Sequence, residues 1–478
     1  MANIAISLSL CVSLLFLFHG CLAQQQQQQF WQSMRSQQQH RFRAKTQCQI
    51  QQLSAREPTF RFQSEAGVSE YWDASNDEFE CAGIEFVRHQ VQPKGLVLPF
   101  YTNAPRLTFI VEGSGILGTV IPGCAETYES EESGSSSRYS GEEGRRGDRH
   151  QKLRRFRRGD VIALPEGITT FVYNDGDAPL TYVSMMDIGN DNNQLDFKFR
   201  KFLLAGNPES IDRPQGEGRY MRRRGEKEAQ ETRNVFYGFD EELLAEAFNA
   251  DPELMRKLQG REDERGIIVR AEKLRMVLPE WESEDEERQD RRRGYYNGLE
   301  ETFCSYKIKR NLDHPTSADL YNPRGGRISN VNSQSLPILN YVQLSAQRGI
   351  LYKNAVVAPQ WCTNAHSAMY VTRGSARVQV VGTQGRSVFD GEVSKGQLLI
   401  VPQNFVVVKK ASQEGFEWIA FKTNDNAMNA QLAGRLSAIR AMPNEVLMNA
   451  FGISRDEAKS LKFGREESTL FSPSQRYA

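Results

Sequence analysis

The sequence predicts a mainly β protein with two tandem antiparallel β-domains, barrels or sandwiches, each followed by a short pair of helices. Three observations predict this fold. The chain contains an internal repeat, the repeated blocks alternate apolar and polar residues, and the last block of each repeat changes to helical period. At 478 residues the chain is also too long for one hydrophobic core, so two or three domains are expected.

The first two repeated blocks have the pattern of strands. NAPRLTFIVEGSG at 103–115 aligns without gaps with NAHSAMYVTRGSA at 364–376, and GDVIALPEGITTFVYN at 159–174 matches GQLLIVPQNFVVVKKA at 396–411. Their short alternating runs, separated by Gly and Pro, favour antiparallel strands. The first copy also carries a Ser-, Gly- and charge-rich insertion at 126–155, which we expect to be a solvated loop.

The third repeated block has helical period. FDEELLAEAFNADPELMRKL at 239–258 lines up with MPNEVLMNAFGISRDEAKSL at 442–461, and each copy reads as a helix with an apolar stripe, a turn and a second helix. A helical pair this short does not bury its apolar stripe alone. The stripe needs its own β-domain or a neighbouring subunit as a partner. Because it lies outside both β-domains, we favour subunit contact.

The N-terminus has the pattern of a secretory signal peptide. Residues 4–18 form an apolar run that is shorter than the roughly 20 residues needed to span a bilayer. Small residues follow up to Ala23, and cleavage is expected before Gln24. A membrane anchor is the weaker alternative, and no later apolar stretch is long enough to span.

These features divide the chain into five segments. A signal peptide at 1–23 precedes a Gln-rich disordered N-terminus at 24–45. The first β-domain with its helices occupies 46–279, a charged disordered linker 280–297, and the second β-domain with its helices 298–478. The linker contains ESEDEERQDRRR, which buries too little apolar surface to order itself. Long disordered polar loops are therefore part of the predicted fold.

The junction after the linker, YYNGLEETFC, is either a turn or a bond meant to be cut. Asn-Gly is the strongest short signal for a hairpin turn, but nothing upstream resembles a strand. The net charge is +7 from Gly298 onward and −7 over 24–297, so a cut between Asn297 and Gly298 would separate an acidic chain from a basic one. The pattern favours an exposed scissile bond.

Five cysteines would remain in the mature chain. In an oxidising compartment an odd number suggests two bridges and one free thiol, and the sequence alone does not assign the pairs. The five are Cys48, Cys81, Cys124, Cys304 and Cys362. No His/Cys spacing is typical of a zinc site.

Other chemistry has little support in the sequence. There is no nucleophile-elbow motif and no phosphate-binding loop motif. The basic runs at 154–158 and 222–224 lie among acidic and Gly-rich residues, which favours solvated loops over polyanion binding. Arg outnumbers Lys 43 to 17 and Gln-rich runs are present, so the side chains are rich in nitrogen, although solvated tails would have the same composition.

Motif spacing in both halves resembles a known family. Four residues match the second cupin motif, G-x5-P-x-G-x2-H-x3-N, at every spacing: Gly159, Pro165, Gly167 and Asn174. Thr170 stands where that motif has a metal-binding histidine. Two such domains in a secreted chain resemble a bicupin. The segments NGLEETFC, PGCAETY, NAHS and LNYVQLSAQRGILYKNAVVAP narrow the resemblance to the legumin-type 11S seed storage globulins.

The resemblance implies two jelly-roll cupin barrels in a nutrient reservoir that holds nitrogen and carbon for germination. It implies transport through the ER to the protein storage vacuole or protein bodies of seed, and trimers that pair into hexamers with copies of itself or related globulin subunits. It also implies cleavage by an asparaginyl endopeptidase between Asn297 and Gly298, and allergenicity.

The family pattern also implies the bridges. Cys48 pairs with Cys81 inside the acidic chain, and Cys124 pairs with Cys304 across the cut. Cys362 matches no family bridge and is expected to be a buried free thiol.

A metal-dependent cupin enzyme, or a protein that binds a sugar or another small ligand, is the alternative function. The four ligand positions of the first half hold Tyr101, Asn103, Thr108 and Thr170, and those of the second half hold Cys362, Asn364, Met369 and Val407. The imidazole and carboxylate ligands that suit Fe, Mn or Ni are missing from both sets, and His366 aligns outside the second set. We expect no catalytic activity, no cofactor or metal, no nucleic-acid partner and no membrane association of the mature form.

Overall fold

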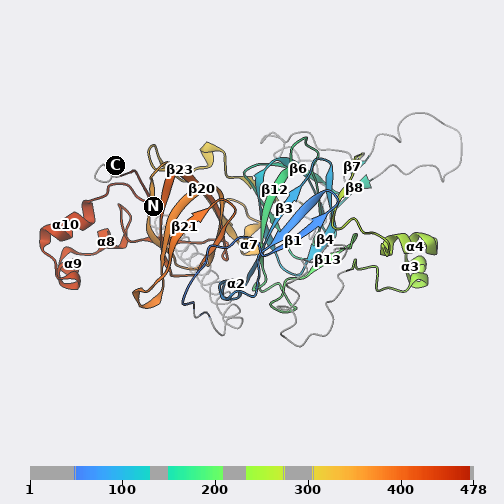
Figure 1. The fold of residues 1–478 in the computed structure, drawn as a ribbon, viewed down its shortest axis with the longest axis horizontal. Helices are drawn as coiled ribbons and strands as arrows, with labels where there is room; N and C mark the ends of the chain where they lie inside the picture. The colour runs from blue at the N-terminus through green and yellow to red at the C-terminus, as the bar shows by residue number, and fades with distance from the viewer. Residues whose placement is uncertain are drawn as a thin grey trace, which may run out of the picture.

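The computed structural model describes residues 48, 50–126, 128–129, 149–207, 233–272, 274, 304 and 306–473. Two β-barrels lie side by side, and a helical group projects from the far end of each (Figure 1). The predicted signal peptide with Ala23 and Gln24, the Gln-rich segment, the linker 280–297 and the Asn297–Gly298 bond lie outside the described residues. The mainly β fold with two barrels is confirmed.

The first barrel consists of two antiparallel sheets. One has the order β1 (Phe60–Ser64), β2 (Gly67–Tyr71), β3 (Ile84–Val91), β12 (Leu180–Asp187), β5 (Arg106–Glu112), β10 (Asp160–Leu164) and β15 (Lys309–Asn311). The other has the order β13 (Lys201–Leu203), β4 (Gly95–Thr102), β11 (Thr169–Tyr173), β6 (Ser114–Val120) and β9 (Leu153–Arg157), with β14 (Ile268–Arg270) also on β4. Strands β7 (Tyr128–Glu129) and β8 (Arg149–His150) pair separately, and helix α2 (Asp77–Ala82) precedes β3.

The second barrel is one antiparallel sheet. Its main path is β16 (Leu320–Asn322), β17 (Gly326–Val331), β18 (Ser345–Leu351), β23 (Val406–Lys422), β19 (Val356–Cys362) and β24 (Asn429–Gln431). Strand β20 (Ser367–Val381) pairs with β21 (Ser387–Ser394), β22 (Leu398–Val401) and β23, while β25 (Leu470–Phe471) pairs with β19. Short helical turns lie at η4 (Pro315–Ser317), α7 (Leu339–Val342) and η5 (Thr383–Gly385).

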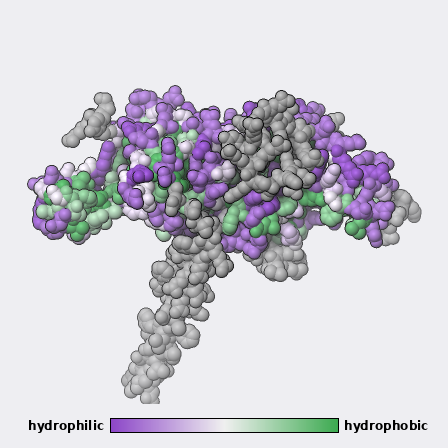
Figure 2. All heavy atoms as spheres, turned by 60° about the horizontal axis from the view of Figure 1, so that its bottom comes forward, coloured by the Kyte–Doolittle hydropathy of each residue, from purple (hydrophilic) through white to green (hydrophobic). Residues whose placement is uncertain are grey.

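A helical pair follows each barrel, as the third repeated block predicts. They are α3 (Glu241–Phe248) with α4 (Pro252–Gln259), and α9 (Asn444–Phe451) with α10 (Arg455–Phe463), the latter preceded by α8 (Ala438–Ala441). The Asp240 and Asp251 side chains cap α3 and α4, and Ser454 forms a capping box on α10. Hydrophobic residues gather on the surface of both helical groups (Figure 2).

The two barrels share a hydrophobic core. Phe86 of β3 stacks on Tyr370 of β20 and contacts Phe421 of β23, with ring centroids 5.9 and 5.8 Å apart. Equivalent arginines of the repeat, one in each barrel, contact equivalent aromatic residues of the other barrel. Arg88 donates to the Tyr370 hydroxyl at 3.1 Å, and Arg348 lies over the ring of Phe109. The barrels therefore pack against each other through matching surfaces.

Each barrel incorporates a segment from the other half of the sequence. Strand β15, which follows the linker, pairs with β10 of the first barrel. In return, the N–H of Leu53 donates to Val388 O at 2.8 Å, and Arg56 forms a bridge with Leu398 of the second barrel. The two halves are therefore interlocked by backbone hydrogen bonds.

The prediction of a solvated loop is wrong for the end of the insertion and its basic run. Residues 153–157 form β9, in which Leu153 and Phe156 are buried on opposite faces: Leu153 packs with Ile116 and Tyr173, and Phe156 belongs to the main core. Arg154 is also buried, and its guanidinium donates to the Thr119 hydroxyl at 2.9 Å. Arg155 pairs with Asp175 at 2.7 Å. The run at 222–224 lies outside the described residues.

Candidate functional site

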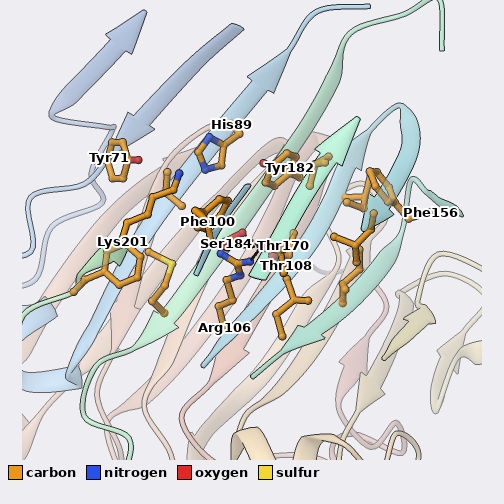
Figure 3. A pocket seen from close by; sticks show the side chains of 18 residues that line it. Tyr71, His89, Phe100, Arg106, Thr108, Phe156, Thr170, Tyr182, Ser184 and Lys201 are labelled. Carbon is orange, nitrogen blue, oxygen red and sulfur yellow. Dashed lines mark hydrogen bonds between the residues drawn. The ribbon is translucent and has the colours of Figure 1, made fainter. Parts of the chain in front are cut away.

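The metal-ligand positions of the first cupin motif do not converge in the first barrel. Tyr101 stacks on Phe202 with ring centroids 4.8 Å apart. Asn103 accepts from the N–H of Arg200 at 2.7 Å and donates to Lys198 O at 3.0 Å, so it fastens the loop before β13. Thr108 and Thr170 line a cavity inside the barrel (Figure 3). Two of the four positions therefore meet in the interior, and both hold hydroxyls.

A buried arginine lies beside these hydroxyls. Arg106 begins β5, two residues before Thr108, and strand alternation places both side chains on the inner face. Its guanidinium donates to the Thr170 hydroxyl and lies over the Phe100 ring, with Cζ 4.4 Å from the centroid. Burial lowers the pKa of Arg106 to about 10, so it is a cation at neutral pH.

A lysine supplies a second interior cation. Lys201 of β13 places Nζ 3.8 Å from the centroid of the same Phe100 ring. Burial, and then the charge of Arg106, lower the pKa of Lys201 to about 7. Among the described residues no carboxylate forms an ion pair with Arg106 or Lys201.

The remaining polar groups of the cavity are neutral. The His89 imidazole Nδ1 lies 2.8 Å from the Ser69 hydroxyl, and its ring lies against Tyr182 with centroids 4.9 Å apart. Burial, followed by the charges of Lys201 and Arg106, holds the pKa of His89 well below its usual range. Burial raises the pKa of Tyr182, which keeps its phenol protonated. Thr108 and Ser184 share a hydrogen bond of 2.7 Å.

The cavity itself is small and mostly apolar. Its volume is about 40 Å³, and its wall is completed by aliphatic and aromatic side chains, among them Ile110, Leu117, Phe156, Ile162 and Leu164. The arrangement combines the Arg106 cation, a lysine that is about half protonated at neutral pH and three Ser or Thr hydroxyls with an apolar wall. Such a site would hold a small anion in preference to a cation.

In the second barrel, the described residues at the equivalent ligand positions do not line a cavity of this kind. Asn364 donates to Asn426 O at 3.0 Å and accepts from the N–H of Met428 at 2.9 Å, so it fastens a loop as Asn103 does. Met369 and Val407 are buried in the hydrophobic core. His366 accepts from the N–H of Gln403 at 3.3 Å. These side chains have packing roles.

The cysteines join distant parts of the chain. A disulfide links Cys48 to Cys81 in α2, and another links Cys124, after β6, to Cys304, just before the segment that enters the first barrel. These are the pairs that the family resemblance implies. Cys362 at the end of β19 is buried and free.

No group of three or more His, Cys, Asp and Glu side chains in the described ranges is placed to hold a metal ion. Within the same ranges, no helix is long and apolar enough to cross a membrane.

The sequence indicates only some of the residues that line this cavity. The motif spacing identified Thr108 and Thr170, and strand alternation from Thr108 would have placed Arg106 on the same face. Lys201 gave no local signal, because β13 reaches the barrel through a non-local pairing with β4.

The chain is similar to known proteins over nearly its whole length. The family model described as Cupin matches residues 52–210 and 310–459. An 11S globulin seed storage protein 1 from Carya illinoinensis is 47% identical over 98% of this chain and 96% of its own. An 11S globulin subunit beta from Cucurbita maxima is 47% identical over 99% of this chain and 98% of its own.

Solved structures agree with these matches. The coconut allergen cocosin superposes with a TM-score of 0.77 at 45% identity, covering 89% of this chain and 100% of its own. Pumpkin seed globulin gives 0.77 at 46% identity, covering 90% of this chain and 100% of its own. A hazelnut vicilin at 15% identity shares the fold, with a TM-score of 0.62.

Proposed function

The chain belongs to the 11S seed storage globulins, and from this premise we propose that it is stored as a self-assembled particle of proteolytically processed subunits. Its function is that of a seed storage protein, a reservoir of nitrogen and carbon. Its 43 Arg residues and its Gln-rich runs suit this role, because their side chains carry nitrogen. The exposed apolar faces of the two helical pairs carry the assembly proposal.

These faces are large for an isolated molecule. Large apolar side chains with about half of their surface or more exposed lie on both helical pairs: Leu243, Phe248 and Leu254 on one, and Val446, Phe451, Leu461 and Phe463 on the other. Exposed apolar patches of this kind mark interaction sites. Because the pairs lie at opposite ends of the molecule, one face of a subunit would meet the other face of its neighbour (Figure 1).

Head-to-tail contact between two different faces closes into a ring when the rotation between subunits allows it. We propose that the ring is a trimer and that two trimers form a hexamer, with copies of this chain or related globulin subunits. The repeat places Phe248 and Phe451 at equivalent positions, so each contact brings together two similar helical pairs.

Processing forms the second part of the proposal. An asparaginyl endopeptidase cleaves between Asn297 and Gly298, after removal of the signal between Ala23 and Gln24 in the ER, and the product is kept in the storage vacuole or protein bodies. The Cys124–Cys304 disulfide would then be a covalent link across the cut. Cys48–Cys81 would stay within the acidic chain.

The interlocked halves support the same proposal, since they would keep the two chains together without the disulfide. The ladder between β10 and β15 joins residues from either side of the cut. Arg158 and Arg348 both approach Asp313, at 3.5 and 2.8 Å, so an ion-pair network also spans it. Leu53 and Arg56 anchor the start of the acidic chain on the second barrel.

Charge substitutions on the two faces test the assembly. Phe248→Glu places a charge in one apolar face and Phe451→Glu in the other. Each variant alone should therefore fail to form the contact and should sediment as a monomer. Mixed together, the two variants still offer one intact pair of faces and should form a dimer that does not grow further. Tyr321→Glu is a matched control, because Tyr321 is 65% exposed on β16, which is not part of either helical pair. Trimers from either face variant would contradict the proposed ring.

A further inference from the structure

We propose that the cavity of the first barrel binds a short-chain monocarboxylate, with its carboxylate at the Arg106 guanidinium and its alkyl group against the apolar wall. Lys201 adds a second positive charge when its amine is protonated. This binding role is separate from storage and assembly, since the cavity lies inside the barrel and the helical faces lie at the ends of the molecule (Figures 1 and 3).

The unbalanced charge of the cavity calls for an anion. Arg106 and Lys201 both line it, and in the described part of the chain neither has a carboxylate partner. A buried charge without a partner is costly, and a bound anion removes that cost. Glu85 does not fill this role. Its Oε1 accepts from the N–H of Phe199 at 3.2 Å, and burial raises its pKa to about 7.

The donors suit a carboxylate. A guanidinium presents several N–H groups in a planar fork that matches the two carboxylate oxygens. One Arg106 N–H is used on Thr170, which fixes the orientation of the group. The hydroxyls of Thr108 and Ser184 bond to each other at 2.7 Å, and one of their two protons is left to donate to a ligand. Figure 3 shows Arg106, Thr108, Thr170 and Ser184 gathered on one side of the cavity.

Volume and lining set the size of the ligand. A cavity of about 40 Å³ has room for roughly three water molecules at 10–15 Å³ each. This space matches acetate or propionate. The apolar wall of Ile110, Leu117 and Ile162 would contact the alkyl group, whereas it offers nothing to the outer oxygens of sulfate or phosphate. An aromatic acid such as phenylacetate is too large.

The corresponding space of the second barrel lacks these groups. The ladder pair Thr108–Ser184 corresponds to Met369–Ala420, and the pair His89–Tyr182 corresponds to Gly349–Trp418. The indole of Trp418 is fully buried against Gly349, where a Cβ atom would overlap the ring. We therefore expect one carboxylate per chain, in the first barrel.

The test is titration of the purified full chain with methyl-¹³C-labelled acetate, followed by NMR at constant ionic strength with chloride as the replaced anion. Saturable binding of one acetate per chain is expected, with propionate competing and phenylacetate failing to compete. The thermal midpoint of unfolding should rise with acetate relative to equal chloride, because a ligand that binds only the folded state stabilises it.

Two lysine variants localise the site. Lys201→Met should weaken acetate binding by roughly tenfold or more, since it removes a buried charge beside the ligand. Lys409→Met is the matched control, a buried lysine of the second barrel, and should leave acetate affinity unchanged. Absence of saturable binding up to about 100 mM acetate, equal losses in the two variants, or competition by phenylacetate would each overturn the proposal.

Discussion

The two barrels keep the same strand register but fill their interiors differently. In the first, His89 lies opposite Tyr182 and Thr108 opposite Ser184; in the second, the same ladder positions hold Gly349 with Trp418 and Met369 with Ala420. The first interior contains a small cavity with a few polar side chains in a mostly apolar wall, while the second is closed by a large indole. The backbone register of a duplicated domain can therefore persist while one copy retains a site and the other becomes solid core.

The position of the buried cation also differs between the two barrels. The first barrel has Arg106 opposite Met186 on the ladder, and the second has Lys422 opposite Ser367 at the equivalent pair. The positive charge has thus moved to the neighbouring strand. Lys422 is buried, and so is Lys409, whose Nζ lies 5.1 Å from the centroid of the Trp418 ring.

The largest difference in stability between the two barrels is expected when the equivalent aromatic residues Trp418 and Tyr182 are each truncated to alanine. Trp418→Ala should lower the free energy of unfolding by about 3–5 kcal/mol, because a fully packed indole leaves a large void. Tyr182→Ala should cost less, since Tyr182 already borders a cavity. Urea unfolding of the two variants checks this, and equal losses would mean that the barrels are packed alike.

The next largest difference in stability is expected when the two equivalent arginines at the boundary between the barrels, Arg348 and Arg88, are each replaced by methionine. Arg348→Met should destabilise the protein by roughly 3 kcal/mol, because Asp313 and Glu417, at 2.8 and 2.5 Å, both lose a buried partner. The equivalent Arg88 has one carboxylate partner, Glu70, and is more accessible. Arg88→Met should therefore cost less in the same unfolding assay. A larger loss for Arg88→Met would contradict the importance of the network around Asp313.

The smallest expected effect is a change in pH dependence. Burial, and then the charge of Lys422, lower the pKa of Lys409 to about 7 from an ordinary value of 10.5. Between these values the unfolded chain binds more protons than the folded one, so stability rises with pH over that window. Lys409→Met should reduce this rise in the thermal midpoint and stabilise the protein near pH 7. Lys410→Met, a change at the exposed neighbour, should leave the profile as it is.

Local patterns predicted the elements of the fold but not their long-range partners. Helical period identified both helical pairs, and alternation identified β5, β10, β11 and β20. The pairing of β15 with the first barrel left no signal, because a three-residue strand has no period of its own and its partner lies about 150 residues away.

The cavity was harder to predict for a related reason. Arginine and lysine are rarely buried, so Arg106 and Lys201 read as surface residues until the strands around them are placed. The basic run at 154–158 follows the same rule: its charge predicts solvent, whereas residues 153–157 form a strand in which Leu153, Arg154 and Phe156 are buried. The motif spacing, by contrast, correctly located Thr108 and Thr170 in the barrel interior.

The most direct test of the stored, processed particle is sedimentation of the chain after cleavage at Asn297 and reduction of the Cys124–Cys304 bridge under native conditions. The interlocked segments and the shared core predict that the acidic and basic chains sediment together, at the mass of the uncleaved subunit or of its assemblies. Separation of the two chains on reduction alone would contradict it.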